Sequence, residues 1–174
     1  MSYRHIPAML NEVIFYLNCR PGKIYVDATL GGAGHAKAIC DKITPGGVFI
    51  GIDQDIDAIN HAKAALQKFS LHIHLMHGNF VRLPEFLSQL NIDAVDGLLL
   101  DLGVSQHQIE DSGRGFSFRK EEPLDMRMNI QTPETAEMLV NNLAQDELKK
   151  IFKEYGEERW SGQIAEAVQI AGRS

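Results

Sequence analysis

The chain has 174 residues, a formal net charge of −6, and 44% hydrophobic against 23% charged residues. These values describe a globular domain with a substantial core, alone or with part of a second domain. Proteins that bind long nucleic acid through its phosphates are usually basic, so the acidic balance argues against an extended phosphate-binding surface but leaves room for a local basic patch.

The chain shows no sign of membrane insertion or export. No apolar segment approaches the roughly 20 residues that span a bilayer, and the start, "MSYRHIPAML", lacks the apolar stretch of a secretion signal. Cys19 and Cys40 form neither a CxxC pair nor a metal-binding pattern, so both are expected to be reduced thiols. We therefore expect a cytoplasmic protein without a membrane partner.

The first hundred residues alternate between strand and helix patterns. The strands are predicted from continuous apolar or alternating runs at 24–28, 48–53, 71–77 and 94–101. Between them, "HAKAICDKI", an amphipathic segment from Asp57 and "LPEFLSQL" have helical composition. This order predicts an α/β fold, a doubly wound parallel sheet with helices on both faces.

The pattern changes after the fourth predicted strand. Residues 103–131 have no steady period and are predicted to form a long loop, and two or three amphipathic helices are expected from Thr132-Pro133 to Gly172. We divide the chain into a Rossmann-like domain at 1–108, a substrate-facing loop at 109–131 and the start of a helical insertion at 132–174. Four strands leave the fourth at an open edge. We therefore expect a truncated chain or fragment, or one completed by a partner, that self-associates through this edge or through the helices after Thr132.

The segment "VDATLGGAGHAKAI" joins the first strand to a helix through a glycine-rich turn. Such a turn brings backbone N–H groups close to a ligand. The dinucleotide pattern GxGxxG is incomplete, because Lys37 occupies the third glycine position, which weakens an NAD-binding interpretation. Asp53 follows about 20 residues later at the end of the second strand, where an acid accepts ribose hydroxyls. Together these features favour S-adenosylmethionine, although a plain tight connection and a helix N-cap at Asp53 remain alternatives.

The fourth predicted strand leads into "DLGVSQHQI". Ligands of open α/β sheets bind outside the carboxyl ends of the strands, so Asp101 is expected in the same crevice as Gly32 and Asp53. The alternative is a helix cap, but no helix pattern is evident after Asp101.

Seven segments carry a resemblance to a known family. They are "HIPAMLNEV", "VDATLGGAGH", "GIDQD", "DGLLLDLGVSQHQ", "RGFSF", "PLDMRM" and "YGEERW", in this order from His5 to about Ile164. The chain resembles the bacterial MraW/RsmH family of S-adenosylmethionine-dependent methyltransferases, with a Rossmann-like class I fold and an inserted helical subdomain. The resemblance implies methylation of N4 of a cytidine in the decoding region of 16S ribosomal RNA, with the small ribosomal subunit as partner.

The resemblance also implies which residues bind the cofactor. These are Gly32, Ala33, Gly34 and His35 in the turn, Asp53 at the ribose, Phe80 beside the adenine, and Asp101 and Gln108 after the fourth strand. The chain departs from the family pattern where Ala33 replaces a glycine, which is acceptable only with a negative φ, and where Ala36 replaces a serine. Gln106 and His107 replace Ser and Pro, which is expected to loosen a turn near the acceptor base.

Transfer to a cytosine amine requires alignment of nitrogen, methyl and sulfur. We expect an acceptor at the amine N–H groups, either the candidate catalytic residue Asp101 or a main-chain carbonyl of "DLGVS". The target base must be single-stranded or flipped out. Cations and aromatics alternate in the loop, as expected of an RNA-facing lid, and the candidate substrate contacts are Arg114, Phe116, Phe118, Arg119 and Arg127. The alternative is a loop whose Phe residues fill the core and whose arginines pair with neighbouring acids.

Three further patterns have simpler interpretations. His72 and His74 share a strand face but lack a third metal ligand, "DQDID" lacks the glycine and glutamate of a calcium loop, and "YGEERW" is typical of a helical ion-pair cluster. We expect no metal site. The competing functions are a catalytically silent cofactor- or RNA-binding fragment and, less favoured, an NAD-binding oxidoreductase.

Overall fold

A computed structural model describes residues 7–172 of the chain. The elements in chain order are α1 (Leu10–Leu17), β1 (Ile24–Asp27), α2 (Gly34–Ile43), β2 (Val48–Asp53), α3 (Ile56–Leu66), β3 (His72–His77), the 3-10 helix η1 (Phe80–Arg82), α4 (Leu83–Gln89), β4 (Gly97–Leu99), α5 (Gln106–Glu110), α6 (Ala136–Asn142), α7 (Gln145–Glu154) and α8 (Ser161–Gly172). The His5 and Ile6 of the first family segment lie outside the described residues.

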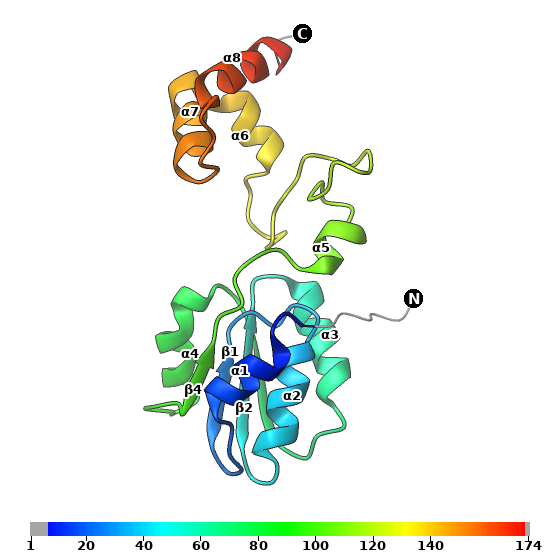
Figure 1. The fold of residues 1–174 in the computed structure, drawn as a ribbon, viewed down its shortest axis with the longest axis vertical. Helices are drawn as coiled ribbons and strands as arrows, with labels where there is room; N and C mark the ends of the chain where they lie inside the picture. The colour runs from blue at the N-terminus through cyan, green and yellow to red at the C-terminus, as the bar shows by residue number, and fades with distance from the viewer. Residues whose placement is uncertain (1–6, 173–174) are drawn as a thin grey trace. The chain divides into compact units, whose positions relative to one another are not determined.

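The four strands form one parallel sheet in the order β3-β2-β1-β4 (Figure 1). The register places Asp27, the last residue of β1, opposite Gly51 of β2 and opposite Leu99 of β4. The strand order reverses between β1 and β4, and ligands of doubly wound sheets bind at such a point. The predicted α/β fold with a parallel, doubly wound sheet is confirmed.

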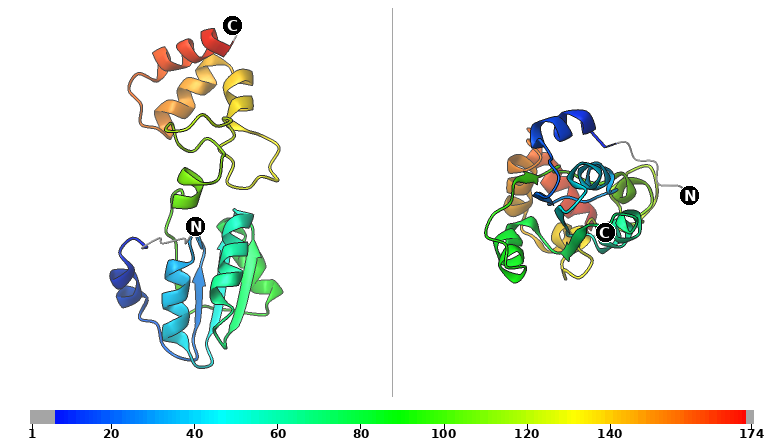
Figure 2. Two further views of the ribbon diagram at one scale, coloured as in Figure 1. Left: turned by 90° about the vertical axis from the view of Figure 1, so that its right-hand side faces the viewer. Right: turned by 90° about the horizontal axis from the view of Figure 1, so that it is seen from below.

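Helices cover both faces of this sheet, because successive side chains of a strand point to opposite sides. Tyr25 and Phe49 belong to the cluster that packs against α2 and α3. Val26 and Ile50 belong to the other cluster, which includes Phe86 of α4. Figure 2 shows α4 across the strands from α2 and α3. The core therefore lies on both sides of β1 and β2, as the continuous apolar runs predict.

Several boundaries differ from the sequence-based expectation. The fourth strand is Gly97–Leu99, shorter than the predicted 94–101, and α1 was not predicted. The loop predicted at 103–131 contains α5, and the first helix after it begins at Ala136, with Thr135 as its N-cap, and not at Thr132-Pro133. The expectation of two or three helices in this region is met by α6, α7 and α8.

The chain divides into two compact units, one ending at Asp111 and the other beginning at Ser112. The first contains the sheet. In the second, α8 packs against α7 and α6, with Leu148 and Ala165 buried. Gln169 Nε2 donates to the Leu143 carbonyl oxygen at 2.9 Å and so connects α8 to the end of α6.

The outer edge of β4 has no strand partner within residues 7–172. Leu98, Leu100 and Leu102 are exposed along this segment. One face of β4 contacts α1, and a Cβ at Gly97 would collide with the Tyr25 ring of β1 and lie 3.2 Å from the Leu17 side chain of α1. The open fourth strand expected from the sequence is therefore present, whereas self-association through it stays a prediction. None of the helices in the described part of the chain is long and apolar enough to cross a membrane.

Candidate active site

The glycine-rich turn begins directly after β1 and ends where α2 starts. Gly31 has a φ of 44°, and Ala33, the N-cap of α2, has a φ of 57°. The expectation that Ala33 has a negative φ is therefore wrong. A left-handed conformation costs an L-residue about 1–2 kcal/mol. The turn retains it because the Ala33 N–H donates to the Leu30 carbonyl at 2.7 Å and its methyl group is fully buried.

Asp53 ends β2 and holds the turn in place. Its Oδ2 accepts the Gly31 N–H at 2.9 Å, and its Oδ1 accepts the Asp55 N–H at 2.8 Å. Burial raises the pKa of Asp53, and these backbone hydrogen bonds oppose the rise. The Gln54 backbone also donates to this carboxylate, and a carboxylate has about four lone-pair positions, so Asp53 retains acceptor capacity for a ligand hydroxyl. Asp53 is not a helix N-cap, because that position of α3 belongs to Asp55.

Asp27 is a further candidate site residue that the sequence-based assignment did not name. It ends β1 and is fully buried, and its Oδ1 accepts the Thr29 N–H at 3.1 Å. Its Oδ2 has no hydrogen-bond partner within the part of the chain that the structure describes. Burial raises the pKa of Asp27 to about 7, and the nearby charges of Asp53 and Asp101 also raise it, against hydrogen bonds from Thr29. The sequence contains a pattern that could have identified Asp27, because this acid ends the apolar run before the glycines.

Asp101 lies two residues beyond β4, beside the glycine turn. Its N–H donates to the Thr29 Oγ1 at 2.8 Å, and its Oδ2 lies 3.7 Å from the Nδ1 of His35 in the first turn of α2. The His35 ring is buried, and its Nε2 lies 3.0 Å from the Ala8 carbonyl oxygen. The Asp101 side chain is about half exposed, at 48%. The structure thus brings together a half-exposed carboxylate, a buried imidazole and the glycine turn.

Gln108 is buried and connects α5 to α3. Its Nε2 donates to Asp55 Oδ2 at 2.9 Å, while its Oε1 accepts the Ser105 N–H at 2.9 Å and completes a capping box. The turn containing Gln106 and His107 is therefore a capped helix start, and the expectation that it is loosened is wrong. Ser105 supplies the cap because its Oγ accepts the Gln108 N–H at 3.2 Å.

Phe80 follows β3 and is half-buried against the hydrophobic cluster that contains Val26, Ile50 and Phe86. Asn79 fixes this segment, because its Nδ2 donates to Gln54 Oε1 at 3.0 Å and its Oδ1 accepts the Val81 N–H at 2.9 Å. The end of β3 is thereby joined to the end of β2, and Phe80 follows the residue that makes this link.

A cavity of about 270 Å³ opens beside the turn. Its lining residues come from the turn, from the start of α3 and from α5: Gly31, Asp55, Asp57, Ala58, His61, Ser105 and His107. Burial and the charge of Lys37 lower the pKa of His61, whereas a hydrogen bond with the Gly32 backbone raises it. No group of three or more potential metal ligands exists among residues 7–172, and His72 and His74 lie on the edge strand β3.

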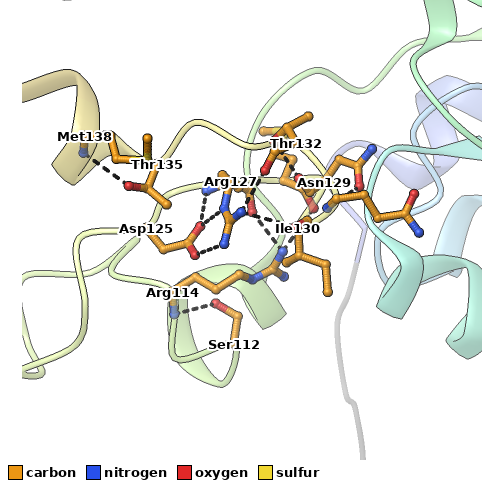
Figure 3. A network of polar contacts seen from close by, with 11 residues as sticks. Ser112, Arg114, Asp125, Arg127, Asn129, Ile130, Thr132, Thr135 and Met138 are labelled. Atoms are coloured by element: carbon orange, nitrogen blue, oxygen red, sulfur yellow. Dashed lines mark hydrogen bonds and ion pairs between the residues drawn. The ribbon is translucent and has the colours of Figure 1, made fainter. Parts of the chain in front are cut away.

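In the second unit, Arg114 and Arg127, two of the predicted RNA-contacting arginines, make hydrogen bonds to other residues of their own loop (Figure 3). Arg127 donates through Nη2 and Nε to Asp125, at 2.6 and 2.8 Å, and through Nη1 to the Thr132 carbonyl at 2.7 Å. Arg114 Nη1 donates to the carbonyl oxygens of Arg127 and Met128, at 2.9 and 3.0 Å. Side-chain hydrogen bonds from Arg127 lower the pKa of Asp125.

The remaining loop candidates are placed differently. Phe118 is 99% exposed, and Arg119 is also exposed. Phe116 is half-buried, and the Cζ atom of Arg114 lies over its ring, 5.7 Å from the ring centroid. Phe118 and Arg119 are thus accessible to a ligand. Pairing of an arginine with an acid, the alternative weighed for this loop, is observed for Arg127 and Asp125.

Comparison with known proteins gives the same family along nearly the whole chain. The model of the MraW methylase family matches residues 2–173. Ribosomal RNA small subunit methyltransferase H of Desulfosudis oleivorans is 52% identical over all of this chain and 56% of its own length, and that of Geobacter sulfurreducens is 50% identical over 95% of this chain and 53% of its own. A candidate rRNA-methylase structure from Clostridium thermocellum superposes with a TM-score of 0.48 at 22% identity, over 58% of this chain and 54% of its own. The chain spans about half the length of the curated relatives it matches. The chain belongs to the MraW methylase family.

Proposed function

We propose that this chain carries the S-adenosylmethionine site of an RNA methyltransferase that acts on N4 of a cytidine in 16S ribosomal RNA, in the decoding region of the small subunit. The observation that carries the proposal is the meeting of Asp53, Asp101 and the glycine turn at the carboxyl ends of β1, β2 and β4. The curated relatives are named for a small-subunit ribosomal RNA substrate, which supports the choice of substrate.

The residues fit S-adenosylmethionine, which when bound supplies a methyl group on a sulfonium sulfur. Asp53 retains acceptor capacity for a ribose hydroxyl beside its backbone hydrogen bonds. The first N–H groups of α2 suit a carboxylate tail, because a helix N-terminus attracts negative charge. The unpartnered Oδ2 of Asp27 suits a cationic group nearby. The turn places Lys37 where a pyrophosphate-binding turn has its third glycine, so a dinucleotide fits less well.

The chemical task of the protein is to hold an amine in line with the methyl group. A cytosine amine is a poor nucleophile because its lone pair is delocalised into the ring. Asp101 is half exposed and can accept an amine N–H, which favours the pyramidal nitrogen that attacks. The Thr29 hydroxyl fixes the Asp101 main chain by accepting its N–H. We assign Asp101 the role of orienting the acceptor amine.

The loop of the second unit is proposed to contact RNA mainly through Phe118 and Arg119. An exposed aromatic ring next to a cation suits base stacking with phosphate pairing. Arg114 and Arg127 are proposed to shape this loop through the carbonyl and carboxylate contacts described above. Phe116, beneath Arg114, belongs to the same framework.

The test is transfer of a radiolabelled methyl group to small ribosomal subunits and to their isolated RNA, with the Desulfosudis oleivorans relative as positive control. We expect label at N4 of a cytidine, located by nuclease digestion and mass spectrometry. Label on a protein or on another RNA position would refute the substrate assignment. A chain that binds S-adenosylhomocysteine but transfers no label where the relative does is a silent binding fragment, and a chain that binds only NAD overturns the proposal entirely.

A further inference from the structure

The contacts of His35 single it out from the other residues of the turn. The Ala8 carbonyl carries no proton, so the 3.0 Å contact requires that His35 Nε2 carries the hydrogen and donates it. In a neutral imidazole only one nitrogen is protonated, and Nδ1 therefore presents its lone pair. That lone pair faces the Asp101 carboxylate.

The separation between Nδ1 and Asp101 Oδ2 is 3.7 Å, longer than a hydrogen bond. With Nε2 donating to Ala8 and Nδ1 without a hydrogen, the two facing atoms are both acceptors and share no proton. A proton placed between the two atoms would join them in a charge-assisted hydrogen bond. The arrangement therefore has a position for one proton.

Other acids lie near this pair of groups, because the charges of Asp53 and Asp101 both act on the Asp27 carboxyl. The His35 ring is buried, whereas the Asp101 side chain is 48% exposed, so the pair connects the core to the solvent-facing side of the turn. The Ala8 contact leaves the orientation of the ring unchanged when the second nitrogen is protonated.

We propose that His35 is a positioning residue for Asp101 and holds, together with it, the proton released by the acceptor amine, an inference that rests on the proposed function. The amine lone pair forms the N–C bond while the C–S electron pair leaves with sulfur. The nitrogen then gives its N–H proton to Asp101 Oδ2 and keeps the electron pair of that bond. The proton moves on to His35 Nδ1, which restores the Asp101 carboxylate beside an imidazolium.

Two substitutions of His35 test the roles of Nδ1 and Nε2 one at a time. Asparagine places an amide near the position of Nδ1, and glutamine places one near Nε2. His35→Gln therefore keeps a donor to Ala8 but removes the group that faces Asp101, whereas His35→Asn does the reverse. We expect His35→Gln to lower kcat about 100-fold, the lower range of general acid–base effects, and to lower kcat by more than it weakens S-adenosylhomocysteine binding or raises the KM for RNA. His35→Asn, which can still orient Asp101 but accepts no proton, should lose less in kcat and more in melting temperature.

The arrangement itself is tested without activity. Nitrogen-15 spectra of the histidine rings of the 174-residue chain should show His35 as the Nε2–H form at pH 8, and Asp101→Asn should shift its Nδ1 resonance, because the new amide can donate to it. An Nδ1–H ring, or an Nδ1 resonance that does not respond to Asp101→Asn, overturns the inference, as does wild-type turnover by His35→Gln. If the Desulfosudis oleivorans relative transfers a methyl group and this chain does not, the proposed function fails. The spectra of the His35 ring still test the arrangement of His35 and Asp101 in that case.

Discussion

The buried carboxyl of Asp27 should make the stability of the first unit depend on pH in an unusual direction. Its pKa is raised to about 7 in the folded chain, against an ordinary value of 3.8, chiefly by burial. Below pH 4 the carboxyl is protonated in both states and contributes nothing. Between pH 4 and 7 unfolding releases a proton, so the free energy of unfolding falls as the pH rises, and above pH 7 the loss is complete.

The magnitude follows from the width of this window. Each pH unit corresponds to about 1.4 kcal/mol, so a window of about three units gives about 4 kcal/mol. This is an upper value, because local relaxation lets water or a counter-charge reach a buried carboxylate. Asp27→Asn keeps an oxygen for the Thr29 N–H and removes the charge. The variant should therefore become more stable relative to the wild type as the pH rises from 5 to 8, by at most about 3 kcal/mol.

Hydrogen exchange of the Val26 and Ile50 amides, in the two central strands, reports unfolding of this unit. Wild type and variant are compared at each pH, so that the intrinsic exchange rate cancels. Asp93→Asn, at an exposed aspartate, is the matched control and should behave as the wild type. A difference between Asp27→Asn and wild type that stays constant from pH 5 to pH 8 would refute the assignment of a near-neutral pKa to this buried carboxyl.

Three further predictions concern the ligands and the open edge. Asp53→Ala should weaken S-adenosylhomocysteine binding in calorimetry by about 1.5–3 kcal/mol, the scale of hydrogen bonds to a charged group, and unchanged affinity would remove Asp53 from the site. Phe118→Ala should weaken binding of ribosomal RNA by about 1–3 kcal/mol in a filter assay, the range for loss of one stacked base, with cofactor affinity unchanged as the control. The chain should self-associate in light scattering across a concentration series, with weak exchange protection at residues 98–102, because the β4 edge exposes unpaired backbone groups and leucine side chains. A monomer with strong protection there would contradict this.

The sequence by itself determined the parallel sheet and the positions of two candidate site residues at or near strand ends. Val48–Asp53 was predicted with its observed bounds, because a buried strand needs a continuous apolar run and its ending acid is visible in the sequence. Asp53 and Asp101 could be placed at one edge of the sheet since the carboxyl ends of parallel strands meet there. The family followed from short segments of unusual residues.

Only the tertiary structure decided what each polar group contacts. The left-handed conformation of Ala33 depends on the Leu30 carbonyl and on burial of its methyl group, neither of which is a local sequence property. Asp27 Oδ2 is buried without a hydrogen-bond partner among residues 7–172, and this depends on the residues packed around β1. The sequence left both a phosphate contact and an acid pairing open for Arg127, and the structure pairs it with Asp125. Hydrogen bonds between residues distant in sequence require atoms placed within about 3 Å, and periodicity and spacing carry no information at that scale.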